Sequence, residues 1–157
     1  MKRILFVCTG NTCRSPMAQV LFQEILAQKK QPRKIQFEVA SAGIYTQEGM
    51  SPSLEAIEAM HGEGLDLSSH KSRKISGDLL KQADLILTMT AAHCSYLCNN
   101  YPEQNENIFH LSQYAGIGNK EISDPYGLGR QAYLETVEQL KEILDKAAER
   151  LLNELEQ

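Results

Sequence analysis

Two residues that can do chemistry lie close together near the N-terminus, within the run VCTGNTCRSP (residues 7–16). Cys8 and Arg14 are separated by five residues, and the run follows an apolar stretch and precedes an amphipathic one. A loop of this length between a strand and a helix can direct backbone N–H groups, and the positive end of the helix, toward one anion. Gly10 and Asn11 permit the positive φ that such a turn requires. Because a guanidinium can bind two phosphate oxygens at once, Arg14 completes a predicted oxyanion cradle.

Cys8 lies at the mouth of this predicted cradle. The field that attracts a phosphate also stabilises a thiolate, which is a strong nucleophile and can form a covalent phosphocysteine. Such a reaction needs an acid to protonate the leaving group and a base to activate water, and one carboxyl group can serve as both in turn. Asp124, in the run ISDPYGLG, is the best candidate, because the proline after it fixes the backbone. An Asp-Pro pair alone is a common loop start, so the prediction depends on its combination with the cysteine loop.

The elements that must position these residues alternate between strands and helices. Apolar or alternating runs predict four strands, at residues 3–7, 35–40, 84–89 and 107–111. Helical spacing and capping residues predict helices that open at Ser15-Pro16 and that cover 53–62, 76–83 (a capped turn or short helix), 91–99 and 130–155. This order predicts an α/β fold with a four-stranded parallel sheet and helices on both faces (Rossmann-like), in a single domain over residues 1–157.

The predicted topology brings the two chemical segments to one edge of the sheet. Ligands of parallel sheets bind at the carboxyl ends of the strands. Cys8 directly follows the first predicted strand, and the long loop at 112–130, which holds Asp124, follows the fourth. Loops of this length in small domains are often functional.

Composition limits the classes of partner. The 157 residues have a net charge of -4, which argues against broad nucleic-acid binding. Residues 1–34 carry seven Lys/Arg and one Asp/Glu, whereas residues 35–157 carry nine and nineteen, so the cysteine loop lies in the basic segment. No run resembles a signal peptide or approaches the length of a membrane span. We therefore expect a cytoplasmic monomer with reduced thiols and with no membrane or nucleic-acid partner.

The cysteine loop from Cys8 to Pro16, the DPY segment at 124–126 and the order of strands and helices together resemble the low-molecular-weight protein tyrosine phosphatase family, over essentially the whole chain. The resemblance implies Cys8 as nucleophile, Arg14 as clamp for the phosphate and the transition state, and Asp124 as general acid and then general base. It implies phosphate or substrate contacts by Thr9, Gly10, Asn11, Thr12, Cys13, Arg14, Ser15 and Tyr126, and a supporting hydrogen-bond network of Asn11, Ser15, Ser41 and His70. The substrates would be phosphorylated proteins, and neither a metal nor an organic cofactor is expected.

Two residues make the chain more similar to the bacterial protein-arginine phosphatases. Many tyrosine phosphatases of the family have a bulky aliphatic residue where this chain has Thr12, and often a second aromatic residue where it has Gly127. Threonine gives a smaller and more polar wall beside the phosphate, which suits a guanidinium leaving group better than a phenol ring. Asp124 can then pair with the guanidinium before it donates its proton. Tyr126 departs from this pattern, in which the aromatic residue is often phenylalanine.

Two other enzyme activities remain open, tyrosine phosphatase and arsenate reductase. Arsenate reductases on this fold use two downstream cysteines, the first of which directly ends the third strand, where this chain has Thr90. Cys94 and Cys98 come later, so we expect them to be packing or surface thiols, and they lack the C-x2-C spacing typical of zinc sites. A catalytically inactive module that binds phosphoproteins is a further alternative, which the intact nucleophile, clamp and acid disfavour.

Cys13 has two open interpretations. Cys13 follows Cys8 by five residues in a tight loop, so its thiol can approach the Cys8 thiol to bonding distance. A Cys8–Cys13 disulfide would switch the enzyme off reversibly and protect Cys8 from over-oxidation. Alternatively, Cys13 is a small buried side chain that fills space.

Overall fold

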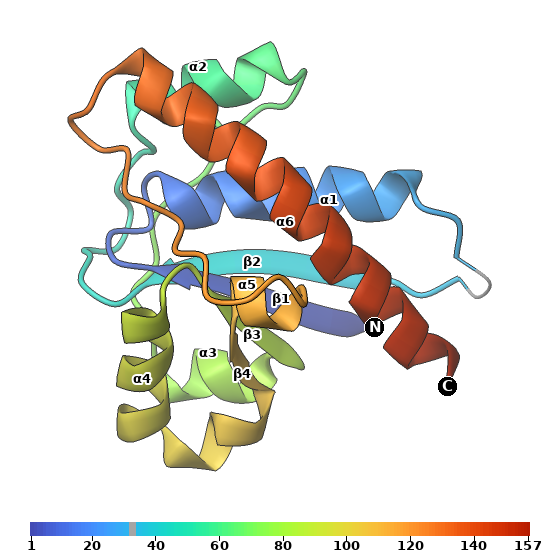
Figure 1. Cartoon of the computed structure of the whole chain (residues 1–157). Helices are drawn as coiled ribbons and strands as arrows, with labels where there is room; N and C mark the ends of the chain where they lie inside the picture. Colours follow the sequence, from blue (N-terminus) through green and yellow to red (C-terminus); the bar gives the residue numbers. More distant parts are fainter. Residues whose placement is uncertain (32–33) are drawn as a thin grey trace.

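The chain forms one four-stranded parallel sheet in the order β2-β1-β3-β4, shown in Figure 1. The structure is a computed structural model, and it describes residues 1–31 and 34–157. The strands are β1 (Lys2–Cys8), β2 (Phe37–Gly43), β3 (Leu85–Thr88) and β4 (Ile108–His110). Each neighbouring pair is parallel, which confirms the predicted sheet.

Helices cover both faces of this sheet, as the alternation of elements predicts. They are α1 (Arg14–Gln28), α2 (Leu54–Gly62), α3 (Gly77–Gln82), α4 (Ala91–Asn100), α5 (Leu111–Tyr114) and α6 (Arg130–Glu156), with a 3-10 helix, η1 (Pro102–Asn107), before β4. Helices α1 and α6 lie on one side, together with α2 and α5, and α3 and α4 lie on the other (Figure 1). Among the described residues, no helix is both long and apolar enough to cross a bilayer.

Strand β1 is buried on both faces because helices cover both. Ile4, Phe6 and Cys8 belong to the core beneath α1 and α6, whereas Leu5 and Val7 belong to the core beneath α3 and α4. Successive side chains of a strand point to opposite faces, so this alternation directs the thiol of Cys8 toward the α1 side of the sheet.

Most predicted helix starts are confirmed, but that of α1 is wrong. Ser53 and Ser76 cap α2 and α3 by accepting hydrogen bonds from backbone N–H groups of the first turn. Helix α1 begins at Arg14, one residue before the predicted serine cap, and has no side-chain cap. The hydroxyl of Ser15 is instead used inside the cysteine loop.

Two other predicted boundaries shift. Strand β2 continues to Gly43, beyond the predicted end at residue 40, because it keeps pairing with β1 up to Cys8. The predicted loop at 112–130 begins with the short helix α5, so the irregular segment that carries Asp124 is shorter than expected.

Candidate active site

The loop of residues 9–13 joins β1 to α1 at the carboxyl edge of the sheet. Asn11 adopts a φ of 56°, the left-handed conformation predicted for this turn, whereas Gly10 does not adopt it. The backbone N–H of Asn11 donates to Cys8 Sγ at 3.3 Å. The turn at Asn11 therefore folds the loop back over the sulfur.

Cys8 is almost fully buried, at 2% exposure, at the base of this loop. Its Sγ lies 2.8 Å from the hydroxyl oxygen of Ser15, and the Asn11 side-chain amide donates to that same oxygen at 2.9 Å. Because the Ser15 oxygen already accepts from Asn11, its hydroxyl hydrogen is free to donate to the sulfur. Two donors thus point at Cys8 Sγ and hold the sulfur at the base of the loop.

The residues around 70–73 hold Asn11 in its strained conformation. The Asn11 side-chain carbonyl accepts from the backbone N–H of Arg73 at 2.9 Å, and the Asn11 backbone carbonyl lies 3.0 Å from His70 Nε2. Burial, reinforced by the charges of Arg73 and Lys71, lowers the pKa of His70, although its bond to Asn11 opposes the shift. A neutral His70 that donates from Nε2 satisfies this carbonyl, so the structure places Asn11, Ser15 and His70 in one network.

Ser41 does not join that network, contrary to the prediction. It pairs in register with Phe6, two residues before Cys8, and its hydroxyl donates to the Gln19 side chain of α1 at 2.7 Å. Ser41 therefore ties β2 to α1 beneath the loop. The SAG run resembles the family pattern, but strand register sets Ser41 opposite Phe6, whereas Gly43 lies opposite Cys8.

The guanidinium of Arg14 is buried, at 6% exposure, and is fixed from both sides. Its Nη1 donates to the backbone carbonyl of Ile122 at 2.9 Å, and its Nη2 donates to the hydroxyl of Thr9 at 3.4 Å. Nη2 also lies 3.7 Å from the carboxylate of Asp124, whose side chain is half exposed. The predicted clamp and the predicted acid, 110 positions apart in the sequence, are therefore neighbours.

Backbone hydrogen bonds fix the segment that carries Asp124. The N–H of Ile122 donates to the carbonyl of Met89 after β3, at 3.1 Å. Asp124 itself accepts from the N–H of Tyr126 at 3.1 Å. The turn after it closes through the N–H of Leu128, which donates to the carbonyl of Pro125 at 3.0 Å, and Gly127 lies in this turn with a φ of 76°. Glycine is favoured at such a position, which gives a local reason for the missing second aromatic residue.

These side chains surround a cleft of about 230 Å³. Its lining consists of residues 8–14 with Met50, Asp124 and Tyr126. The cleft thus contains a buried sulfur, a guanidinium that accepts no hydrogen bonds and a half-exposed carboxylate, which together can bind an oxyanion, attack it and exchange a proton with solvent.

Comparisons with known proteins agree with this geometry. The family model described as low molecular weight phosphotyrosine protein phosphatase matches residues 3–157. The chain belongs to this family. A protein-arginine-phosphatase of Geobacillus stearothermophilus is 35% identical over 152 residues, which cover 97% of each protein. The low molecular weight protein-tyrosine-phosphatase PtpB of Staphylococcus epidermidis is 35% identical over 144 residues, 92% of this chain and 95% of the relative.

A solved structure supports the fold of this phosphatase family member. It is the YwlE arginine phosphatase, as a Cys-to-Ser mutant with a phosphorylated active site serine. The two share 32% identity and a TM-score of 0.88, and the match covers 95% of each chain. The observed α/β architecture is therefore the low-molecular-weight phosphatase fold, as the sequence predicts.

In this phosphatase structure, Cys13 lines the cleft, and its thiol also contacts side chains of the α2 cap and of α6. Its Sγ lies 3.2 Å from the hydroxyl of Tyr133 and 3.4 Å from that of Ser53, which lie 3.1 Å from each other. Cys8 and Cys13 are both free thiols. A Cys8–Cys13 disulfide requires Cys13 to leave these partners, so the observed position favours the packing role, and the disulfide stays a prediction.

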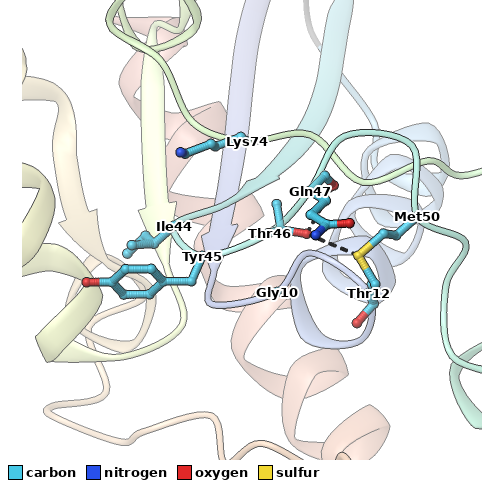
Figure 2. A pocket seen from close by; sticks show the side chains of 8 residues that line it. All are labelled: Gly10, Thr12, Ile44, Tyr45, Thr46, Gln47, Met50 and Lys74. Atoms are coloured by element: carbon cyan, nitrogen blue, oxygen red, sulfur yellow. Dashed lines mark hydrogen bonds between the residues drawn. The ribbon is translucent and has the colours of Figure 1, made fainter.

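A second, more open groove of about 530 Å³ continues from the cleft. Gly10, Thr12 and Met50 line both cavities. Figure 2 shows Thr12 and Met50 at one end of the groove and Tyr45 at the other. The residues after β2 that line this groove carry no catalytic side chain, so no sequence motif marks them as part of the site.

The structure adds His93, which the motifs of the sequence do not predict as a site residue. His93 Nε2 lies 2.9 Å from the hydroxyl oxygen of Thr9, a residue of the cysteine loop. Burial and then the charge of Arg14 lower the pKa of His93 to about 4, against an opposing effect of Asp124. The signal that could have found it is its position, four residues after the third predicted strand, because ligands of parallel sheets bind at the carboxyl ends of the strands.

The remaining cysteines lie outside the cleft. Cys94 and Cys98 are partly buried and pack against the core beneath α3 and α4, as expected for packing thiols. Burial, with the neighbouring Cys98, raises the pKa of Cys94 to about 11. Neither lines the cleft around Cys8, which removes the geometric basis for a thiol relay. Among the described residues, no three His, Cys, Asp or Glu side chains are grouped as a metal site requires.

Proposed function

We propose that the protein is a cysteine-dependent phosphatase that hydrolyses phosphoarginine in protein substrates. The observation that carries the proposal is the convergence of Cys8, Arg14 and Asp124 on one cleft, with Thr12 in its wall. The family membership supports the phosphatase chemistry, and the arginine phosphatases among the relatives support the choice of substrate.

In the first step, Cys8 acts as the nucleophile. Its sulfur attacks the phosphorus, an S–P bond forms, and the P–N bond to the substrate guanidinium breaks. Arg14 and the N–H groups of the loop bind the non-bridging oxygens, whose charge they stabilise most in the transition state. Protonated Asp124 gives its proton to the departing nitrogen.

In the second step, Asp124 acts as the base. Its carboxylate takes a proton from water, whose oxygen attacks the phosphorus, and the S–P bond breaks to return the Cys8 thiolate and release phosphate. These two steps use no cofactor. The related arginine phosphatase with a phosphorylated serine at its active site supports a covalent intermediate at this position.

Thr12 supports arginine rather than tyrosine as the phosphorylated residue. Its side chain is only partly exposed and lies between the cleft and the groove, where a bulkier aliphatic side chain would narrow the passage. The planar guanidinium of a phosphoarginine substrate can also form a charge-assisted hydrogen bond with the nearby carboxylate of Asp124. The competing activity is tyrosine phosphatase, which is favoured by the exposed aromatic ring of Tyr126 and by the relatives of that name.

The groove beside the cleft suits a protein substrate. It would hold residues that flank the phosphorylated side chain, between Tyr45 and Met50, while the phosphoryl group lies on the loop. We expect the protein to act as a monomer in the cytoplasm, because thiols stay reduced in that compartment.

One peptide sequence, synthesised with either phosphoarginine or phosphotyrosine, tests the proposal. We expect a higher kcat/KM for phosphoarginine. Thr12→Ile should shift the ratio toward phosphotyrosine by about tenfold, the scale of one added methylene group in a pocket. Thr12→Val is the matched control, because it removes the hydroxyl and keeps the shape. A wild-type preference for phosphotyrosine would refute the arginine assignment and leave the phosphatase mechanism intact.

A further inference from the structure

His93 is held next to the active-site loop by the way β3 leads into α4. The N–H of Met89 donates to the carbonyl of Val7 at 3.1 Å, which ties the end of β3 to the end of β1. Thr90 then caps α4, and its hydroxyl accepts from the N–H of His93 at 3.1 Å. His93 is therefore fixed through its backbone by Thr90, and its ring is held by the contact of Nε2 with Thr9.

At its tip, His93 shares a hydroxyl with the phosphate clamp. Thr9 Oγ1 lies 2.9 Å from His93 Nε2 and accepts from Arg14 Nη2 at 3.4 Å. A guanidinium only donates hydrogen bonds, so one acceptor position of the Thr9 oxygen is already used. What the hydroxyl hydrogen of Thr9 does depends on the tautomer of His93.

The other ring nitrogen decides that tautomer. His93 Nδ1 is buried and has no hydrogen-bond partner among the described residues. Buried N–H groups without an acceptor are rarer than under-satisfied acceptors, so the proton belongs on Nε2 and the lone pair on Nδ1. Burial and the charge of Arg14 lower the pKa of His93 and so keep its ring neutral. A neutral ring carries a single N–H, in agreement with a proton on Nε2 alone.

With the proton on Nε2, His93 donates to Thr9, and the Thr9 oxygen accepts two hydrogen bonds. A hydroxyl has two acceptor positions and one hydrogen. That hydrogen is then free to donate into the cleft, which Thr9 lines. The two donors also restrict the rotation of the hydroxyl.

We propose that His93 is a positioning residue, which aims the Thr9 hydroxyl at a phosphoryl oxygen in the cleft and holds Arg14 Nη2 in place through the same oxygen. The inference rests on the proposed phosphatase function. Because charge on the phosphoryl oxygens changes during transfer, an aimed donor contributes more in the transition state than in the bound substrate. Loss of His93 should therefore lower kcat more than it raises KM.

Three variants of His93 test the role of Nε2. His93→Gln places an amide N–H near the position of Nε2 and should keep kcat within about threefold of wild type, whereas His93→Leu should lower it about tenfold, less than the loss of a direct oxyanion donor. His93→Asn is the matched control, because its shorter amide reaches only the position of Nδ1, and it should behave like His93→Leu. Removal of the Thr9 hydroxyl by Thr9→Val should make the His93→Leu effect disappear.

The outcomes separate this role from a structural one and from the proposed function. Wild-type kcat in His93→Leu, or an equal loss in the Gln and Leu variants, would overturn the positioning role. If the wild-type protein hydrolyses neither phosphopeptide, the proposed function fails. The imidazole ¹H–¹⁵N NMR spectrum of the wild-type protein still decides the inference in that case: a proton on Nε2 supports it, and a proton on Nδ1 refutes it.

Discussion

The stability of the protein in mild acid should depend on His93. Burial, then Arg14 and, more weakly, His110 lower the pKa of His93 from 6.5 to about 4, and Asp124 opposes them. The unfolded chain binds a proton at this side chain near its ordinary pKa, whereas the folded protein binds one only near the lowered pKa. Between these two values the unfolded state holds more protons, so the free energy of unfolding falls as the pH falls.

The size of this effect follows from the two pKa values. They differ by about 2.5 units, and one unit corresponds to about 1.4 kcal/mol, so crossing the whole window removes about 3 kcal/mol of stability. At about pH 5, nearly all unfolded molecules and few folded ones are protonated at His93, so the loss relative to about pH 7 is about 2 kcal/mol. His93→Gln has no titrating ring and should lack this part of the acid sensitivity.

Urea unfolding at about pH 7 and about pH 5 measures the difference directly. The chain has no tryptophan, so far-ultraviolet circular dichroism is the suitable signal. Between the two conditions, the wild-type protein should lose about 2 kcal/mol more than His93→Gln. His61→Gln, on the exposed surface of α2, controls for the removal of an imidazole. Equal losses in wild type and His93→Gln would show that the ring titrates alike in the folded and unfolded states, and the reasoning would fail.

Three further substitutions test the site and its supports. Cys8→Ser should abolish turnover and keep phosphate binding, as measured by calorimetry; substantial turnover would exclude Cys8 as the nucleophile. Asp124→Asn should slow turnover about 10² to 10⁴-fold and most for poor leaving groups, and a uniform loss across leaving groups would argue against general acid catalysis. Ser53→Ala removes the cap of α2 and a contact of the Cys13 thiol, so the free energy of unfolding should fall by about 1 kcal/mol. An unchanged urea midpoint would contradict the importance of that cap.

The parts of the site that the sequence predicts are those set by local patterns. The spacing of Cys8 and Arg14 fixes a loop whose ends belong to β1 and α1, and alternation along β1 sets the face on which the sulfur lies. The need for an acid and the long loop with its Asp-Pro pair point to Asp124, and family resemblance adds His70. The structure places Asp124 beside Arg14 and His70 beside Asn11. Each of these contacts rests on a recognisable motif.

The parts that the sequence does not predict depend on register and on contacts between distant segments. Ser41 differs from its predicted role because strand register, which the motif does not encode, sets it opposite Phe6. Ser15 resembles a helix cap in sequence, but the sulfur of Cys8 competes for its hydroxyl. His93 reaches Thr9 only because β3 lies next to β1, so no local pattern marks it.

The same sheet edge explains why a glycine ends β2. A Cβ atom on Gly43 would lie 2.8 Å from the backbone oxygen of Thr9 and 3.1 Å from Cβ of Asn11, so any other residue would push the loop outward. This close approach lets the N–H of Tyr45 donate to the Thr9 carbonyl at 2.9 Å. Thr9 is thus held through its backbone by the segment after β2 and through its hydroxyl by His93 after β3. A loop fixed from two neighbouring strands needs little reorganisation when charge develops on a bound phosphoryl group, which is the condition for strong electrostatic stabilisation.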